Sequence, residues 1–365
     1  MSALKIISIE PSGAGGIAHY TFCLNRGLSG VGVECDLLTA RRWCPEFDHP
    51  QARVHKVFDR LRTNPVRLYT LCKRLEASAS LVHWQSASHP NLLMWLTRLV
   101  PLKRLPWVYT VHNVLPHENG PALMPLYAKI YSRMQGLIFH NRYSLEQYEK
   151  HFPAGPALKT IIPMGELGFM VKPDAIAVSP PQDPVILFFG NIRPYKGLDL
   201  LLRAFQRVTR QIPEARLEIV GQALEPFAPY QAMIDELGIR SQVNVRLEYI
   251  PDDEIPTLFR RVSVVALPYK EIDQSAVLLL ALSLGKAVVA AAVGGIPEVI
   301  RPDETGILTP PDDPGAMAEA LVNLLRDSAR IETLGRAAAE DVRARFSWDA
   351  IAVQTEQFYR QLLEG

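Results

Sequence analysis

Short apolar runs alternate with amphipathic stretches along the first half of the chain. The pattern predicts buried strands at Lys5–Ile9, Val33–Thr39, Leu81–Gln85, Trp107–Val111, Leu137–His140 and Thr160–Pro163. Apolar residues recur at helical spacing between these runs, over Ile17–Leu28 and near residues 65–77, 90–100, 123–134 and 144–151. Residues 41–66 are rich in Arg, Pro and His and are expected to be irregular, covering the sheet or forming a binding surface.

The second half repeats the same rhythm after residues 165–184, a Gly- and Pro-rich stretch without periodicity that is typical of a linker. Strands are predicted at 185–189, 216–220, 243–247, 262–267, 287–291 and 306–309, and helices at 197–210, 228–237, 252–260, 275–284, 314–326 and 328–345. Ser347 is a good N-cap for a last helix that runs to residue 363. The alternation predicts an α/β protein with two successive parallel-sheet units.

The stretch Val185–Phe205 combines a buried strand, a glycine turn at Gly190 and an amphipathic helix. Its loop carries Arg193 and Lys196, and ligands of open α/β sheets bind at this carboxyl edge of the strands. Two cations three residues apart suit a diphosphate, or they are simply solvated charges. The stretch alone does not separate these interpretations.

Composition agrees with a two-domain soluble protein, because the chain has 365 residues of which 48% are hydrophobic and 21% charged. The net charge of +1 conceals an asymmetry: residues 1–175 hold 20 Lys and Arg against 12 Asp and Glu, and the remainder holds 19 against 26. A basic half favours an anionic partner, such as a phosphorylated acceptor or a lipid surface, or else the two halves are simply complementary. No basic stripe interleaved with aromatic residues indicates nucleic-acid binding.

Cysteines and hydropathy indicate a cytoplasmic protein. The chain enters its first strand at once, so we expect no signal peptide, and no apolar run reaches the ~18 residues that span a bilayer. Buried, reduced thiols are expected of the cysteines, which lack C-x-x-C spacing: Cys23, Cys35, Cys44 and Cys72.

Residues 13–18 match the pattern G-x-G-x-x-A, with Glu34 and Asp36 about twenty residues on, which is the dinucleotide fingerprint of an oxidoreductase. The match is weak because Glu10 to Ser12 separate the strand from the first glycine. Alternatively, Gly15 and Gly16 bring backbone N–H groups at a helix N-terminus close to a phosphate or a sugar.

The segment 267–277 runs from a strand end into an apolar helix, whose first N–H groups, from Ser275, Ala276 and Val277, are candidates to hold phosphate oxygens. Glu271 and Asp273 either bond sugar hydroxyls or cap the helix. After the next strand, Gly294 and Gly295 allow close backbone approach, and Glu298 either reaches a ribose or caps its own helix.

Histidines mark the carboxyl edge of the first half, where His112 follows a strand and His117 and Glu118 lie in the same loop. His112 is a candidate ligand group or a packed core residue, and His83 and His140 are expected to pack. Metal ligation by His112, His117 and Glu118 is not favoured, because no i, i+4 pairing on a helix supports it.

These loops together resemble those of the two-domain nucleotide-sugar glycosyltransferases of the GT-B fold, specifically the retaining family 4 (group 1). The resemblance covers nearly the whole chain. It rests on GGI at Gly15, TVHN at Thr110, IPMG at Ile162, GNIRPYKG at Gly190, VGQA at Val220, YIPDDE at Tyr249, EIDQSAVLLLALSLGKAVV at Glu271, GGIPE at Gly294, DETGIL at Asp303 and FSWD at Phe346.

The resemblance implies two Rossmann-like domains facing across a cleft: residues 1–170, completed by helix 347–365, for the acceptor, and residues 171–346 for the donor. It implies a nucleotide-sugar donor whose diphosphate is bound by Arg193 and Lys196 and whose sugar is contacted by His112. The acceptor would be a glycan or a lipid-linked glycan, with peripheral membrane contact through the basic domain. Neither a metal nor another cofactor is implied, and front-face attack retains configuration.

Three positions depart from the family pattern. Asn191 stands where the family has an arginine, so Arg193 must reach from two residues later. Ile272 and Leu280 occupy the positions of two glutamates of the family. Gln274-Ser275-Ala276 resembles a QSG subset of that family. With the two glutamates absent, Glu298 is the candidate to bond the ribose. A non-catalytic GT-B protein that binds a nucleotide or a partner transferase is the alternative.

Overall fold

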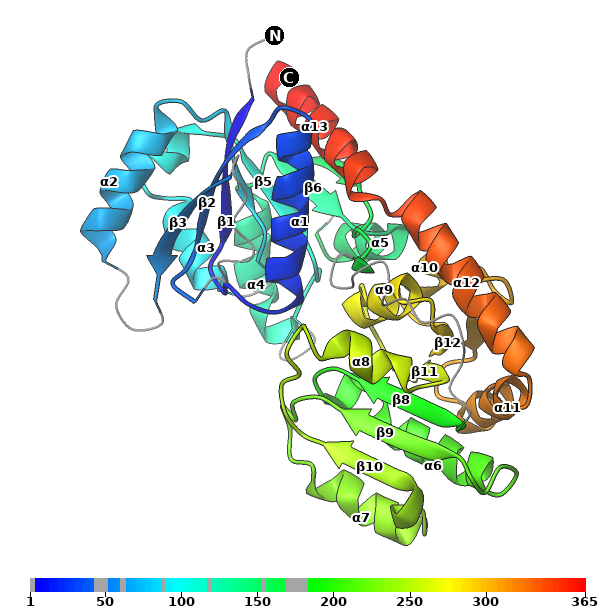
Figure 1. Ribbon diagram of the computed structural model, residues 1–365. Coiled ribbons are helices and arrows are strands. Elements are labelled where there is room, and N and C mark those ends of the chain that lie inside the picture. Colours follow the sequence, from blue (N-terminus) through cyan, green and yellow to red (C-terminus); the bar gives the residue numbers. More distant parts are fainter. Residues whose placement is uncertain are drawn as a thin grey trace. The chain divides into compact units, whose positions relative to one another are not determined.

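The computed structural model describes residues 4–42, 52–59, 64–86, 89–116, 120–152, 155, 157–168 and 183–365. Contacts group the chain into two compact units (Figure 1): unit 1 comprises Met1–Gly165 and Phe346–Gly365, and unit 2 comprises Glu166–Arg345. Each unit is built on one parallel sheet with helices, as the pattern predicts. His117, Glu118, Cys44 and most of the predicted linker lie outside the described residues.

Unit 1 has a seven-stranded sheet in the order β3-β2-β1-β4-β5-β6-β7, and all its neighbouring strands are parallel. The strands are β1 Lys5–Glu10, β2 Glu34–Ala40, β3 Ala52–Phe58, β4 Leu81–Trp84, β5 Trp107–Val111, β6 Gly136–Phe139 and β7 Leu158–Ile161. The order reverses between β1 and β4, where Ile6 lies opposite Leu81. Doubly wound sheets bind ligands at the carboxyl edge of such a switch point.

The helices of unit 1 are α1 Gly16–Gly30, α2 Pro65–Glu76, α3 Pro90–Leu96, α4 Gly120–Tyr131, α5 Arg142–His151 and α13 Trp348–Glu364. The C-terminal α13 packs along α1 (Figure 1). A Cβ atom at Gly27 would lie 2.9 Å from the Trp348 carbonyl oxygen, so the two helices approach closely only because this residue is glycine. The other helices contribute Leu68, Leu93, Tyr127 and Tyr148 to one apolar cluster with the strands.

Unit 2 has a six-stranded sheet in the order β10-β9-β8-β11-β12-β13, again parallel, with its switch point between β8 and β11. The strands are β8 Val185–Phe189, β9 Arg216–Val220, β10 Val243–Arg246, β11 Val264–Leu267, β12 Ala287–Ala291 and β13 Ile307–Thr309. The helices are α6 Leu198–Thr209, α7 Ala228–Glu236, α8 Ile255–Arg260, α9 Ala276–Ser283, α10 Ile296–Val299, α11 Pro314–Leu325 and α12 Ser328–Arg345. Its main core lies between the strands and helices α6, α7 and α11.

One predicted irregular stretch is a strand: the expectation for residues 41–66 is wrong over Ala52–Phe58, which forms β3. β3 lies at the edge of the sheet and carries Arg53, His55 and Lys56, so its polar residues hide the alternation that marks half-buried strands. His55 Nε2 lies 2.8 Å from Oδ1 of the buried Asp36 on β2, and Lys5 Nζ lies 3.2 Å from its Oδ2. The Asp36 carboxylate thus joins the first three strands.

Candidate functional site

The glycine loop of unit 2 folds Lys196 back over the end of β8. Gly190 follows the strand with φ of 97°, and the 3-10 turn Pro194–Lys196 leads to Gly197 at φ of 68°. A Cβ atom at Gly190 would lie 3.0 Å from Lys196 Nζ, and one at Gly197 would lie 2.0 Å from the Pro268 carbonyl oxygen. Glycine is therefore required at both positions, by backbone conformation and by space.

Lys196 is a buried cation, with only 7% of its surface exposed. Burial, and secondarily the charge of Arg193, lower the pKa of Lys196 to about 8. Its Nζ lies 5.6 Å from the ring centroid of Tyr269, a cation–π distance. Within the described part of the chain, no carboxylate forms an ion pair with Lys196. A buried cation without a counter-charge is unfavourable until an anion binds, which makes Lys196 a candidate ligand group.

The N-terminus of α9 lies beside this ammonium. Ser275 is the N-cap, and its hydroxyl accepts a hydrogen bond from the Leu278 N–H at 3.1 Å. The N–H groups of Ala276 and Val277 have no hydrogen-bond partner among the described residues. Val277 Cγ2 would lie 3.2 Å from a Cβ atom at Gly190, so the strand end, the lysine and the helix N-terminus converge. The convergence creates a positive potential suited to phosphate.

The acidic candidates lie on the neighbouring loops of unit 2. Glu271 is exposed, and Asp273 and Gln274 are half-buried just ahead of Ser275. Glu298 is exposed in the first turn of α10. The two loops are in contact, because a Cβ atom at Gly294 would lie 1.5 Å from the Ile272 carbonyl oxygen.

Arg193 is half-buried in the glycine loop, and its carbonyl accepts from the Lys196 N–H at 3.0 Å. The structure thus brings Lys196 together with Val277 around Gly190. Glu271 and Glu298 are exposed on the two loops that contact each other next to this site.

In unit 1 a buried glutamate organises the loop after β1. Glu10 Oε1 accepts from the Ser12 N–H at 3.0 Å, and its Oε2 accepts from the Gly13 N–H at 2.6 Å. Gly15 has φ of 80°, and Gly16 begins α1. A dinucleotide pyrophosphate needs the first glycine amides free of negative charge, so the Glu10 carboxylate argues against the oxidoreductase interpretation.

His112 is buried just after β5, and its two ring nitrogens contact a backbone carbonyl and a second histidine. Its Nε2 lies 2.8 Å from the Gln85 carbonyl oxygen and its Nδ1 lies 3.0 Å from His140 Nε2. His140 Nδ1 lies 3.2 Å from the Ile162 carbonyl oxygen. Burial lowers the pKa of His140 to about 4, and burial together with His140 holds the pKa of His112 well below its usual range. Both rings are therefore neutral at pH 7.

Tyr20, in α1, connects the glycine loop to these histidines. Its ring makes edge-on contacts with His112 and His140, at centroid distances of 5.0 and 5.2 Å. His83 lies deeper in the sheet, where its Nε2 is 2.8 Å from Thr110 Oγ1 and its Nδ1 faces the hydroxyl of Tyr359 in α13. Burial lowers the pKa of His83 to about 3. His83 thus joins α13 to the sheet.

A pocket of about 440 Å³ opens at the carboxyl ends of β1, β2 and β3. Its lining includes Ser12, Arg41, Arg42 and His89, and Arg42 Nε donates to the Ser12 carbonyl at 2.6 Å. His89 has φ of 65°, a strained conformation for a non-glycine residue. No group of three or more His, Cys, Asp or Glu side chains in the described ranges has metal-binding geometry.

Sequence comparison connects both units to one family. A family model described as Glycosyltransferase Family 4 matches residues 14–165, and one described as Glycosyl transferases group 1 matches residues 183–327. The chain is 32% identical to a D-inositol 3-phosphate glycosyltransferase from Kribbella flavida, and the match covers 96% of this chain and 92% of that protein. The enzyme of that name from Corynebacterium aurimucosum is 26% identical, over 95% of this chain and 91% of its own.

Solved structures share the fold. Sucrose-phosphate synthase from Thermosynechococcus elongatus superposes with a TM-score of 0.77 at 23% identity, covering 99% of both chains. HepE from Anabaena, solved with UDP and glucose, gives a TM-score of 0.75 at 19% identity, covering 98% of this chain and 100% of its own. With two parallel-sheet units and family matches in each, the chain belongs to the family 4, group 1 glycosyltransferases of the GT-B fold.

Proposed function

We propose that this glycosyltransferase moves a sugar from a nucleotide diphosphate sugar to a glycan or lipid-linked acceptor, with retained configuration and without a metal. The observation that carries the proposal is the buried ammonium of Lys196, which lacks a carboxylate partner among the described residues and lies beside the N-terminus of α9. The HepE structures, which contain UDP or UDP-glucose, support a donor of this class.

The donor diphosphate binds to unit 2 through Arg193 and Lys196, assisted by the N–H groups of Ser275 to Val277. Glu271 and Asp273 bond the hydroxyls of the transferred sugar. Gln274 lies in the sequence between these two residues and the N–H groups that bind the phosphates. Glu298 bonds the ribose. In unit 1, Gly15 and Gly16 leave space for close approach of the donor, and His112 contacts its sugar.

The reaction breaks the bond between the anomeric carbon and the phosphate oxygen, and forms a bond from that carbon to the acceptor oxygen on the same face. The departing phosphate takes the acceptor proton. Negative charge grows on the phosphate as the bond breaks, so Lys196, Arg193 and the α9 amides stabilise the transition state more than the ground state. These cations supply the charge that a metal ion would otherwise provide.

The acceptor binds to unit 1, and the pocket beside Ser12 and Arg42 is its candidate site. Arginines in this pocket suit an acceptor that carries a phosphate. The names of the relatives, D-inositol 3-phosphate glycosyltransferases, support an anionic acceptor. Among the described residues, no helix has the length and apolarity to cross a bilayer. We place the enzyme in the cytoplasm, with peripheral membrane contact through its basic half.

Substitution of the buried lysine tests the proposal. One hydrogen bond to a charged group contributes roughly 1.5–3 kcal/mol, so Lys196→Ala should lower kcat/KM by about 10-fold to 100-fold or more against the preferred donor in a panel of UDP-, GDP-, ADP- and dTDP-sugars. The control is Lys286→Ala, since Lys286 is buried in the same unit but its Nζ lies 3.2 Å from the Val262 carbonyl, at the amino edge of the sheet. Nucleotide binding without turnover of any donor would favour a non-catalytic protein instead.

A further inference from the structure

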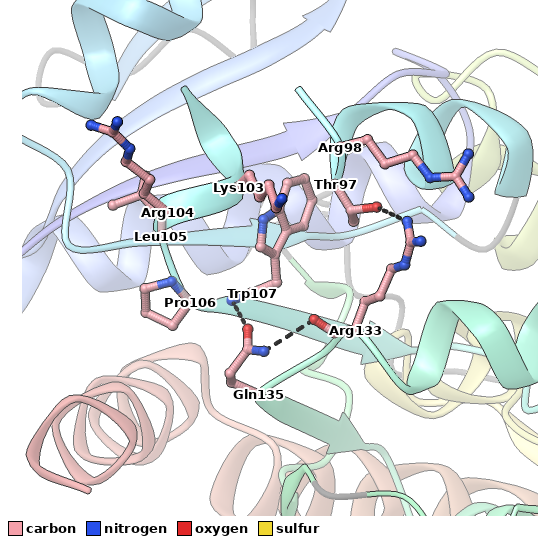
Figure 2. A pocket seen from close by; sticks show the side chains of 9 residues that line it. All are labelled: Thr97, Arg98, Lys103, Arg104, Leu105, Pro106, Trp107, Arg133 and Gln135. Carbon is pink, nitrogen blue, oxygen red and sulfur yellow. Dashed lines mark hydrogen bonds between the residues drawn. The ribbon is translucent and has the colours of Figure 1, made fainter. Parts of the chain in front are cut away.

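A basic pocket lies at the amino ends of strands β5 and β6 of unit 1 (Figure 2). His112 and His140 lie at the carboxyl ends of these strands. It encloses about 730 Å³, and Trp107, the first residue of β5, and Gln135, just before β6, form part of its wall. His112 follows the other end of β5, and a five-residue strand is roughly 16 Å long. The pocket is therefore separate from the donor and acceptor sites proposed above.

Four cationic side chains line this pocket: Arg98, Lys103, Arg104 and Arg133. Arg98, Lys103 and Arg104 are exposed, and none of the four forms an ion pair with a described carboxylate. Between Glu76 and Glu146 the sequence contains a single acidic residue, Glu118. Nearby acidic residues thus do not neutralise the positive charge of this surface, and the surface is suited to bind an anion.

The polar groups of the pocket wall hold Arg133 in place. Arg133 donates to Thr97 Oγ1 at 3.0 Å, and the Gln135 side chain accepts from the Trp107 N–H at 2.8 Å and donates to the Arg133 carbonyl at 3.2 Å (Figure 2). These bonds leave most of the guanidinium donors of Arg133 available to a ligand. A hydrogen-bonded guanidinium flanked by exposed cations suits a phosphate group.

Apolar side chains are exposed beside the same cations. Trp95 is 42% exposed and Val100 is 60% exposed, in the segment that carries Arg98. The Arg98 N–H donates to the Trp95 carbonyl at 3.0 Å, so the indole and the guanidinium are one turn apart. Exposed tryptophan next to Lys and Arg is typical of proteins that lie on the membrane interface, where the ring enters the headgroup layer.

We propose that this pocket docks unit 1 on an anionic phospholipid surface. Arg133 and Arg98 bind the phosphate of a lipid headgroup, Lys103 and Arg104 contact neighbouring anionic lipids, and Trp95 enters the interface. The proposal gives the membrane contact of the proposed function a definite location, and it does not depend on the transfer reaction.

Vesicle cosedimentation tests the docking site, with phosphatidylcholine vesicles compared to vesicles that also contain phosphatidylglycerol. Wild-type protein should bind only the anionic vesicles, and more weakly as salt rises. Each basic residue near the surface contributes roughly fivefold, so the triple variant Arg98→Ala, Lys103→Ala, Arg104→Ala should bind roughly 100-fold more weakly. The control makes the same charge change in unit 2, with Arg216→Ala, Arg260→Ala and Arg261→Ala, and should bind like the wild type.

Two results would overturn the proposal. One is loss of vesicle binding in an α2 variant, Arg67→Ala, Lys73→Ala, Arg74→Ala, with the pocket variant unaffected. The other is saturable binding of free inorganic phosphate that the pocket variant loses, together with no binding to anionic vesicles, which would make the pocket a site for a soluble anion. Transfer to a water-soluble acceptor is measured in parallel, because a failed docking site should leave that activity intact.

Discussion

His112 Nδ1 and His140 Nε2 lie 3.0 Å apart, while the other nitrogen of each ring faces a backbone carbonyl oxygen. A neutral imidazole carries one N–H, so two neutral rings cannot make all three hydrogen bonds. The contact of His112 with the Gln85 carbonyl, at 2.8 Å, is shorter than that of His140 with the Ile162 carbonyl, at 3.2 Å. His140 should therefore carry its proton on Nε2 and donate to His112.

This proton assignment predicts different effects for two substitutions of His140. His140→Gln can place an N–H near the Nε2 position and should keep His112 oriented. His140→Phe leaves a buried acceptor unpaired, which should cost roughly 1–3 kcal/mol of unit 1 stability and lower kcat. Nucleotide affinity, measured by calorimetry, should stay unchanged in both variants because the proposed phosphate ligands lie in unit 2. Equal loss of kcat in the two variants would contradict the assignment.

Donor affinity should depend on pH through Lys196. Because burial and Arg193 lower the pKa of the free enzyme's Lys196 to about 8, the ammonium is charged below pH 8 and must be reprotonated above it before phosphate binds. The Kd of the nucleotide should be constant from pH 7 to about 8 and then rise by up to tenfold per pH unit. Titration calorimetry across this range measures the slope.

Two variants separate Lys196 from other titrating groups. Lys196→Arg keeps its charge to higher pH and should show a flat profile, whatever its absolute affinity. Burial also lowers the pKa of Lys286 to about 8, so Lys286→Arg is the matched control and should keep the wild-type slope. A slope that persists in Lys196→Arg would assign the pH dependence to another group.

Unit 1 should lose stability in acid because of three buried histidines. The pKa values of His83 and His140 are lowered to about 3 and about 4 by burial, and that of His112 is also lowered well below its usual range, whereas an unfolded histidine titrates near 6.5. Between pH 6.5 and about 4 the unfolded state binds more protons, so stability falls as pH falls through this window. Each histidine contributes up to about 1.4 kcal/mol per pH unit. Thermal unfolding of His83→Gln should show a shallower slope, and His151→Gln on α5 should not.

Gly190 should tolerate no side chain. Its φ of 97° is unfavourable for alanine, and the new Cβ atom would lie 3.0 Å from Lys196 Nζ. Gly190→Ala should destabilise unit 2 by roughly 1–2 kcal/mol and weaken nucleotide binding at least tenfold, because the ammonium is displaced. Gly238→Ala is the control: its φ is 69°, but no atom lies within 4 Å of its added Cβ, so it should lose stability without losing affinity.

Both sheets are predictable from the sequence because buried parallel strands are continuous apolar runs, as in Val264–Leu267 and Ala287–Ala291. The edge strand β3 is not, since an edge accepts charged residues such as Arg53 and its pattern resembles a loop. The other edge strands, β7, β10 and β13, keep enough apolar residues to be predicted, so it is the charge of β3 that hides it.

The candidate site is also only partly predictable from the sequence. Lys196 can be identified as a candidate from the sequence, because the strand, the glycine turn and the helix that surround it lie within a few residues of one another. The ring of Tyr269 beside its ammonium, and the contact between His112 and His140, depend on the register of different strands. Glu10 has a local signal, a carboxylate at a strand end just before a glycine loop, but its bond to Gly13 needs the folded turn.

Helix α13 is synthesised after all of unit 2, yet it packs on α1, which is synthesised before unit 2. All of unit 2 is synthesised in the interval between the two parts of unit 1. A nascent chain can thus complete unit 2 while unit 1 still exposes the surface of α1 that α13 covers. Removal of α13 would consequently destabilise unit 1 and spare unit 2, which directly precedes this helix in the sequence.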